Sequence, residues 1–192
     1  MTVNVAQLKI PGCYEIQLPV YSDVRGMLVK SFSYTHFSKH LLEVGFVETF
    51  YTISGENVLR GMHLQVPPAD HAKLVYCVTG NVLDVCLDVR RGSPTFGEHI
   101  SLEISASRKN ALYLPRGVAH GFYVQQAPAV MIYHVTSEHQ PQFDCGIVWN
   151  SFGAEWPTQS PVLSLRDASL PRLKDFSSPF LYTPTDDPKE LK

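Results

Sequence analysis

Four ionisable side chains occur at a spacing that suits proton transfer. Arg60 and His63 lie three residues apart, Lys73 begins an apolar run further along the chain, and His120 follows a Pro-x-Gly turn. These residues supply an anion contact, a base and a cation that can stabilise a developing negative charge. A site of this composition can remove a proton next to a carbonyl group without a cofactor.

Each of these residues also has a structural interpretation. A single histidine in a strand is more often a hydrogen-bonded core residue than a catalytic one. Lys73 is either a solvent-exposed strand end or an inward charge held near Asp84, and its spacing alone favours the exposed position. Together with Arg60, Asp84 and His120, however, they are more ionisable groups than a structural core uses, because burying a charge is costly unless it is paired. The grouping therefore favours a functional role for His63.

Two further residues leave the same alternatives open. Tyr133, in a predicted strand, is either a core tyrosine with a bonded hydroxyl or a general acid that faces His63 across a barrel. Asp167 is either a surface loop acid or, if the tail folds back, a carboxylate that fixes the tautomer of a histidine and raises its basicity.

The sequence contains only half of the usual metal motif of cupin-type barrels. Such barrels combine His-x-His on one strand with a third histidine after a Pro-x-Gly turn. Segment 115–120 matches the second half, whereas Gln65 stands where the second histidine of the first half belongs. Two imidazoles without a glutamate at ligand spacing do not predict a zinc or iron site. We expect neither a metal nor another cofactor.

Strands must position these residues, because short β-branched and aromatic runs dominate the chain. Side chains of the run 82–89 alternate between two faces, and Gly80-Asn81 before it predicts a hairpin turn. The one predicted helix spans Thr35–Glu43. Many short strands separated by turns predict an all-β jelly-roll barrel with short helices. The predicted strands include Lys73–Val78, Val82–Val89, Ala111–Leu114 and Val130–Val135.

The length of 192 residues suits one domain, and we predict a single barrel domain over 1–192. The segment after Trp156 is rich in proline and polar residues. We therefore expect a C-terminal extension from about residue 157 that wraps the barrel rather than a second domain.

The bulk composition excludes several functions. A net charge of −2 provides no basic field for nucleic acid. No apolar run reaches the roughly 20 residues that cross a bilayer, and the N-terminus has no signal-peptide pattern, so we expect no membrane partner. None of the four cysteines forms a C-x-x-C pair. We interpret them as buried thiols in a reducing compartment, the cytoplasm.

An ordered set of motifs resembles the dTDP-4-dehydrorhamnose 3,5-epimerase family, nucleotide-sugar epimerases of the cupin superfamily. The resemblance runs from about Ile10 to Pro171 and implies a cupin jelly roll, a homodimer with strand exchange, and a cofactor-free reaction on a nucleotide-linked 4-keto-6-deoxyhexose. The motifs include Asp23-x-Arg25-Gly26, Val58–His63, Lys73-Leu74-Val75, Gly80-x-Val82-x-Asp84-Val85, Ser93–Gly97, Leu114–Phe122 and Ser164-x-x-Asp167.

The resemblance also implies a role for each matching position. His63 matches the base and Asp167 its partner acid. Lys73 matches the lysine that stabilises the enolate at the C4 oxygen, and Tyr133 the tyrosine that reprotonates the ring carbon from the opposite face. The remaining matches are Arg60 to a diphosphate contact, Arg25 to a contact that reaches across the dimer, and His120 to a residue lining the sugar pocket.

The chain departs from the family where the nucleotide is recognised. Glu48 and Phe50 replace the usual Gln and Asn, and His139 stands near the place of the tyrosine that stacks on the base. An ionised carboxylate only accepts hydrogen bonds, which suits the amino group of cytosine better than thymine. We therefore hypothesise a CDP-linked substrate, with GDP next and dTDP after it.

The predicted function is an isomerase that epimerises this sugar at C3, or at C3 and C5. It would serve deoxysugar biosynthesis for surface polysaccharide such as lipopolysaccharide O-antigen. The alternatives are a 3,4-ketoisomerase on the same kind of substrate, a non-catalytic nucleotide-sugar-binding cupin, and a metal-dependent oxygenase.

Overall fold

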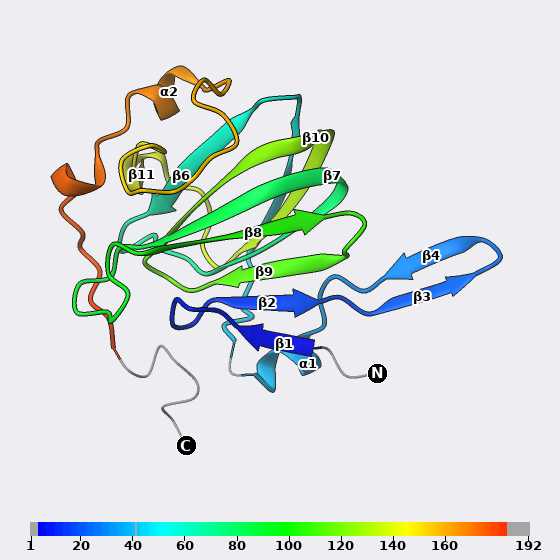
Figure 1. The fold of residues 1–192 in the computed structure, drawn as a ribbon. Helices are drawn as coiled ribbons and strands as arrows, with labels where there is room; N and C mark the ends of the chain where they lie inside the picture. The colour runs from blue at the N-terminus through cyan, green and yellow to red at the C-terminus, as the bar shows by residue number, and fades with distance from the viewer. Residues whose placement is uncertain (1–3, 41, 184–192) are drawn as a thin grey trace.

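The computed structural model describes residues 4–40 and 42–183 of the chain, and strands dominate it (Figure 1). The short helices are α1 (Tyr34–Ser38), α2 (Leu165–Ala168) and two 3-10 turns, η1 (Pro141–Phe143) and η2 (Leu173–Asp175). The strands are β1 (Asn4–Gln7), β2 (Tyr14–Gln17), β3 (Val20–Asp23), β4 (Gly26–Val29), β5 (Glu48–Ser54), β6 (Leu59–Gln65), β7 (Lys73–Asp88), β8 (His99–Ser105), β9 (Asn110–Leu114), β10 (Val118–Val135) and β11 (Asp144–Gly146).

Two long antiparallel strands, β7 and β10, form the centre of the barrel. They pair with each other along nearly their whole length, while β8 and β9 extend the sheet from β7, and β5 and β6 extend it from β10. Strands β2 and β1 continue from β9, and β11 continues from β6. This arrangement confirms the predicted all-β barrel.

The β7–β10 ribbon folds back on itself, which brings its two ends together. His120 and Tyr133 lie thirteen positions apart on β10, which would separate them by roughly 40 Å in a straight strand. Their ring centroids are 6.1 Å apart. The ends of one ribbon therefore supply facing walls of the barrel interior.

The predicted hairpin turn at Gly80-Asn81 is wrong, because both residues lie inside β7. Gly80 has a φ of +83°, and a Cβ there would clash with the carbonyl oxygens of Gln126 and Pro128 on the partner strand. The glycine permits a left-handed backbone and a close approach where the ribbon bends. A turn-like pair of residues thus marks a bend within a continuous strand, where the register of the ladder also shifts.

The predicted helix at Thr35–Glu43 is largely wrong in extent. Helix α1 ends at Ser38, and Ser33 makes no side-chain capping bond at its start; residue 41 lies outside the described residues. Leu42 reaches the core from non-helical backbone. Because short helices are marginal on their own, core contacts rather than helical periodicity placed these apolar residues.

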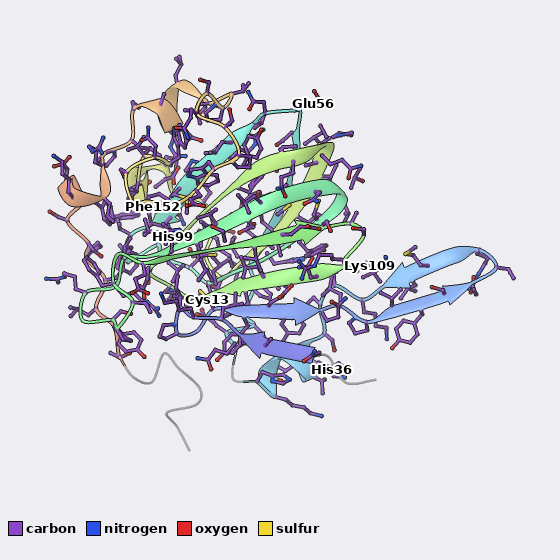
Figure 2. All side chains as sticks on the ribbon, viewed as in Figure 1. Cys13, His36, Glu56, His99, Lys109 and Phe152 are labelled. Carbon is purple, nitrogen blue, oxygen red and sulfur yellow. The ribbon has the colours of Figure 1, made fainter. Side chains whose placement is uncertain are left out.

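The segment after β11 lies along the barrel, with α2 near the top of the view in Figure 1. Backbone bonds join Leu59 to Val162 and Arg91 to Phe180. Phe152 packs edge-on against His99 of β8, with ring centroids 5.8 Å apart (Figure 2). Trp149, Trp156 and Phe180 are buried with the outer face of β7. The extension covers this face and carries Asp167 back to the barrel.

Strands β3 and β4 form a hairpin that projects away from the barrel (Figure 1). Its exposed apolar side chains include Val24, Met27 and Leu28. Among the described residues, no helix is long and apolar enough to span a membrane. All four cysteines are free, three of them buried and Cys145 partly so.

Candidate active site

The barrel interior contains a cavity of about 410 Å³, which falls in the range of small-molecule sites. Seven of the nine predicted site residues line it, and Asp167 lies behind one of them. Arg25 does not line it, because it lies on the projecting β3–β4 hairpin. The seven lining residues are Glu48, Arg60, His63, Lys73, His120, Tyr133 and His139.

His63 and Asp167, distant in sequence, form a hydrogen-bonded pair. His63 Nε2 lies 2.7 Å from Asp167 Oδ1, and Asp167 Oδ2 accepts a bond of 3.1 Å from the Gly61 backbone N–H. Ser164 caps the first turn of α2 by accepting from the Asp167 N–H. Two well-placed contacts thus hold the carboxylate beneath β6, and the predicted pairing exists in the structure.

The charge states of the pair make His63 able to accept a proton. Burial alone would raise the pKa of Asp167, but the bonds from His63 and Gly61 outweigh it and hold that pKa below its ordinary value. An ionised carboxylate only accepts, so Nε2 of His63 carries the hydrogen and Nδ1 has the free lone pair. Burial lowers the pKa of His63, against the opposing effect of Asp167. The imidazole is therefore neutral at pH 7.

Lys73 is buried at the start of β7, so the interpretation that placed it in solvent is wrong. Its Nζ donates a bond of 3.1 Å to the His63 carbonyl oxygen. Burial lowers its pKa to about 8, with Asp144 opposing the shift more than Asp84 does. The inward position follows because β7 begins inside the barrel wall, where β9 and β10 flank it on both sides. The ammonium remains mostly charged at pH 7.

A second histidine–carboxylate pair lies in the same wall. His120 Nε2 is 2.9 and 3.0 Å from the two oxygens of Asp84. Both side chains are buried, and burial raises the pKa of Asp84 despite the opposing effects of His120 and Lys73. His120 lines the cavity from near the start of β10, whereas Tyr133 lines it from near the end of that strand.

Tyr133 is a buried phenol that keeps its proton. Its ring stacks on Phe50 at a centroid distance of 4.7 Å and an angle of 11°. Burial raises its pKa well above the ordinary value of 10. The cavity therefore contains a neutral imidazole that can take a proton, a phenol that can give one, and a buried ammonium.

The predicted recognition residues surround the other parts of the cavity. Arg60 donates from Nε to the Ser54 hydroxyl at 2.9 Å. Glu48 Oε2 accepts a 2.8 Å bond from the His139 backbone N–H. This bond orients Glu48 and ties the segment after β10 to β5.

Several lining residues were not predicted from sequence. Arg166 pairs with Asp144 at 2.8 Å and lies 3.9 Å from Asp167. Its position directly before Asp167 was an available signal, whereas nothing in the sequence pointed to Asp144. Phe50 was noted only as a departure, and its contact with Tyr133 required the fold.

Two glycines explain why β6 and β10 approach so closely beside His63 and His120. A Cβ at Gly61 would lie 2.5 Å from Gly121 Cα. Gly61 also has a φ of +135°, which side chains other than glycine rarely adopt. The glycines in the Arg-Gly-x-His and His-Gly-Phe motifs therefore permit the strand contact that sets the two histidines beside each other.

Within residues 4–40 and 42–183, no group of three or more His, Cys, Asp or Glu side chains is arranged to hold a metal ion. Gln65, which replaces the second histidine of the metal motif, instead accepts from the Gln140 N–H and donates to the Ala69 carbonyl. Its amide shapes the loop around the cavity.

A jelly-roll barrel with a carboxylate-bound histidine, a buried lysine and a protonated tyrosine in one cavity defines the cupin class of sugar-nucleotide epimerases. The sequence model of dTDP-4-dehydrorhamnose 3,5-epimerase matches residues 7–175. The chain belongs to the dTDP-4-dehydrorhamnose 3,5-epimerase family.

Individual relatives agree with this assignment. The dTDP-4-dehydrorhamnose 3,5-epimerase of Shigella flexneri is 36% identical over 90% of this chain and 97% of its own length. The dTDP-6-deoxy-D-glucose-3,5-epimerase of Legionella pneumophila, solved with dTDP-4-keto-L-rhamnose, has a TM-score of 0.89 and 31% identity, covering 94% of this chain and 99% of that one. A 3'-monoepimerase of Streptomyces bikiniensis, solved with dTDP-quinovose, has a TM-score of 0.83 and 30% identity, covering 88% and 87%.

The predicted family, cupin fold and isomerase class are thereby confirmed. The protein is an isomerase that epimerises a nucleotide-linked 4-keto-6-deoxyhexose in deoxysugar biosynthesis. The comparisons favour neither the ketoisomerase nor the non-catalytic alternative.

Proposed function

We propose that the chain inverts C3 and C5 of a dTDP-linked 4-keto-6-deoxyhexose by proton transfer alone. The observation that carries this proposal is the 2.7 Å bond between His63 and Asp167, in the cavity that also contains Lys73 and Tyr133. His63 Nδ1 removes the proton beside the C4 ketone. Lys73 stabilises the enolate oxygen, and Tyr133 returns a proton to the other face.

The chemistry requires a neutral base, a cation and a protonated acid as three separate groups. A ketone acidifies the hydrogens on both neighbouring carbons, and the enolate formed needs a cation in a site with little water. Inversion then needs an acid other than the original base, since a base that returns its own proton restores the starting configuration. Neutral His63, cationic Lys73 and protonated Tyr133 meet these needs without a cofactor.

The nucleotide is proposed to be dTDP, with CDP and GDP as the tested alternatives. The family and the solved relatives are described with dTDP sugars. Glu48 suggested CDP from sequence, but one of its oxygens is occupied by the His139 N–H, which weakens pairing with a cytosine amino group. We place Arg60 at the diphosphate, His120 at the sugar, and Glu48 with His139 near the base.

We further propose a homodimer in which the β3–β4 hairpin reaches a second copy. The hairpin carries exposed Val24, Met27 and Leu28, and such apolar surface favours a partner. Arg25 on this hairpin forms an exposed pair with Asp23 at 2.5 Å, and we place it at the partner's nucleotide. The enzyme would serve surface polysaccharide synthesis, such as O-antigen, in the cytoplasm, where four free thiols are stable.

Proton NMR in D2O tests the function directly. Purified protein is mixed in parallel with dTDP-, CDP- and GDP-4-keto-6-deoxyglucose. Deuterium at C3 and C5, fastest for dTDP, is the expected result. Deuterium at C3 alone would replace the proposal by a 3-epimerase, a faster CDP substrate would overturn the nucleotide, and no exchange with any of them would refute the mechanism.

Tyr133→Phe tests the assignment of the acid. Inversion should slow by about 10²-fold, within the usual range for a general acid, while exchange at C3 persists because proton removal and return to the same face remain possible. Equal loss of exchange and inversion would contradict the role of Tyr133.

A further inference from the structure

Strand β5 presents a row of side chains that each contact a residue of the cavity. Residues two apart on a strand share a face, so positions 48, 50, 52 and 54 point the same way. Glu48 accepts from His139, Phe50 stacks on Tyr133, and Ser54 accepts from Arg60. Strand β5 pairs only with β10 in the described sheet. Glu48, Phe50 and Thr52 of this row also line the cavity, so the row forms one of its walls.

Phe50 and Tyr133 form a close stacked ring pair. The rings are nearly parallel, at 11° and 4.7 Å, and their residues are direct partners in the β5–β10 ladder. The His120 ring also meets the Tyr133 ring, at an angle of 68° and a centroid distance of 6.1 Å. Two rings therefore pack against the buried phenol, so its side-chain torsions have little freedom.

The hydroxyl group of Tyr133 is held less firmly by hydrogen bonds than its ring is by packing. Burial is the main influence on the pKa of Tyr133 and raises it, and Thr52 lies close enough to offset part of that rise. Thr52 Oγ1 itself is buried and makes no hydrogen bond of ordinary length within the described residues. Ring packing, more than hydrogen bonding, therefore sets the direction of the phenol.

We propose that Phe50 is a positioning residue that fixes the direction from which Tyr133 delivers its proton. The inference rests on the proposed role of Tyr133 as the acid. A proton donor must point at the ring carbon within a narrow range of angles, because small misplacements lower rates strongly. With the stack intact, each enolate is protonated from the Tyr133 side; with the stack lost, more enolates regain a proton from His63.

The test compares Phe50→Leu with Phe50→Tyr. Leucine keeps the apolar volume but removes the ring, whereas tyrosine keeps the stack. At saturating substrate in D2O, Phe50→Leu should lower inversion by about three- to tenfold, the size expected for the loss of one aromatic pair, while deuterium exchange at C3 is retained. Phe50→Tyr should restore the native ratio of inversion to exchange.

Ser54→Ala provides a matched change on the same face of the same strand. It removes the acceptor of Arg60, so it should raise KM while leaving the ratio of inversion to exchange unchanged. An altered ratio in Ser54→Ala would show that any change in β5 disturbs the acid, and would overturn a specific role for Phe50.

Other outcomes separate the two proposals. A Phe50→Leu variant with raised KM and an unchanged ratio at saturation would make Phe50 a substrate contact instead. Equal losses of inversion and exchange would also overturn the inference. If Tyr133→Phe lowers inversion selectively and Phe50→Leu does not, only the role of Phe50 fails; if neither does, the assignment of Tyr133 fails as well.

Discussion

Two histidine–aspartate pairs lie at the cavity. They consist of the same residue types but differ in environment. In the first, the His63 side chain is 30% exposed and Asp167 is 4% exposed. In the second, His120 is 4% exposed and Asp84 is fully buried. Both pairs join Nε2 to a carboxylate at hydrogen-bond distance. Both histidines line the cavity, but the first is far more exposed to it than the second.

Burial acts on both carboxylates in the same direction, but the net shifts of their pKa values are opposite. Burial alone would raise the pKa of Asp167, but the hydrogen bond and charge of His63, followed by the Gly61 N–H, outweigh it and lower that pKa. For Asp84, burial prevails over the attraction of His120 and Lys73, and its pKa rises. The balance between burial and the contacts of each carboxylate thus decides which pair has a firmly ionised acid. The comparison supports the proposal that the His63–Asp167 pair removes the proton and that the His120–Asp84 pair shapes the cavity.

The largest expected effect comes from His63→Asn. Exchange at C3 should fall by about 10³-fold, within the range for a general base, while nucleotide binding is nearly unchanged. NMR in D2O and nucleotide titration measure the two quantities. His120→Asn is the matched control; if it abolished exchange and His63→Asn did not, the assignment of the two pairs would be reversed.

The next effect distinguishes the two carboxylates. Asp167→Asn should lower kcat by about 10²-fold, because the amide no longer enforces the Nε2–H tautomer of His63. Asp84→Asn should change kcat by less than about tenfold, or about 1.4 kcal/mol. Steady-state kinetics on both variants measure the difference. Similar losses would mean that the cavity uses both pairs in catalysis.

The buried ammonium of Lys73 should make kcat/KM depend on pH. Its pKa of about 8 means that the ammonium is lost as pH rises through 8, so kcat/KM should fall about tenfold per pH unit above it. The acidic limb should lie below pH 6.5, since burial lowers the pKa of His63. Lys73→Arg keeps its charge, so the basic limb should move upward. A basic limb that stayed near 8 in this variant would assign it to another group.

The smallest expected effect is on stability. The lowered pKa of Asp167 contributes stability above the ordinary value of 3.8, which is lost as pH falls through the folded-state pKa. The raised pKa of Asp84 has the opposite sign, so stability declines as pH rises from 3.8 through its folded-state pKa. Relative to the native protein, the Tm of Asp167→Asn should therefore fall as pH rises to about 4 and stay level above that pH. The Tm of Asp84→Asn should instead rise relative to the native protein as pH increases above about 4. Calorimetry should resolve shifts of about 2–4 °C per kcal/mol; parallel curves would contradict the opposite charge environments.

Motifs with strong local chemistry were predicted well. The strand character of 82–89 and 130–135, and the inward position of His63 between Met62 and Leu64, follow from the two-residue period of strands. The helix at Thr35–Glu43 and the turn at Gly80-Asn81 failed. In both places long-range contacts determined the backbone, and local patterns carry little information about such contacts.

The sequence by itself determined the family, the barrel and the set of reactive side chains, because residue type and alternation are local properties. Only the tertiary structure decided which of those side chains is ionised, buried or accessible. Burial of Lys73, the Gly61 N–H on Asp167 and the Phe50 ring on Tyr133 all arise from segments distant in sequence. A charge state depends on every neighbour in space, and those neighbours exist only once the β7–β10 ribbon has folded back and the tail has closed over it.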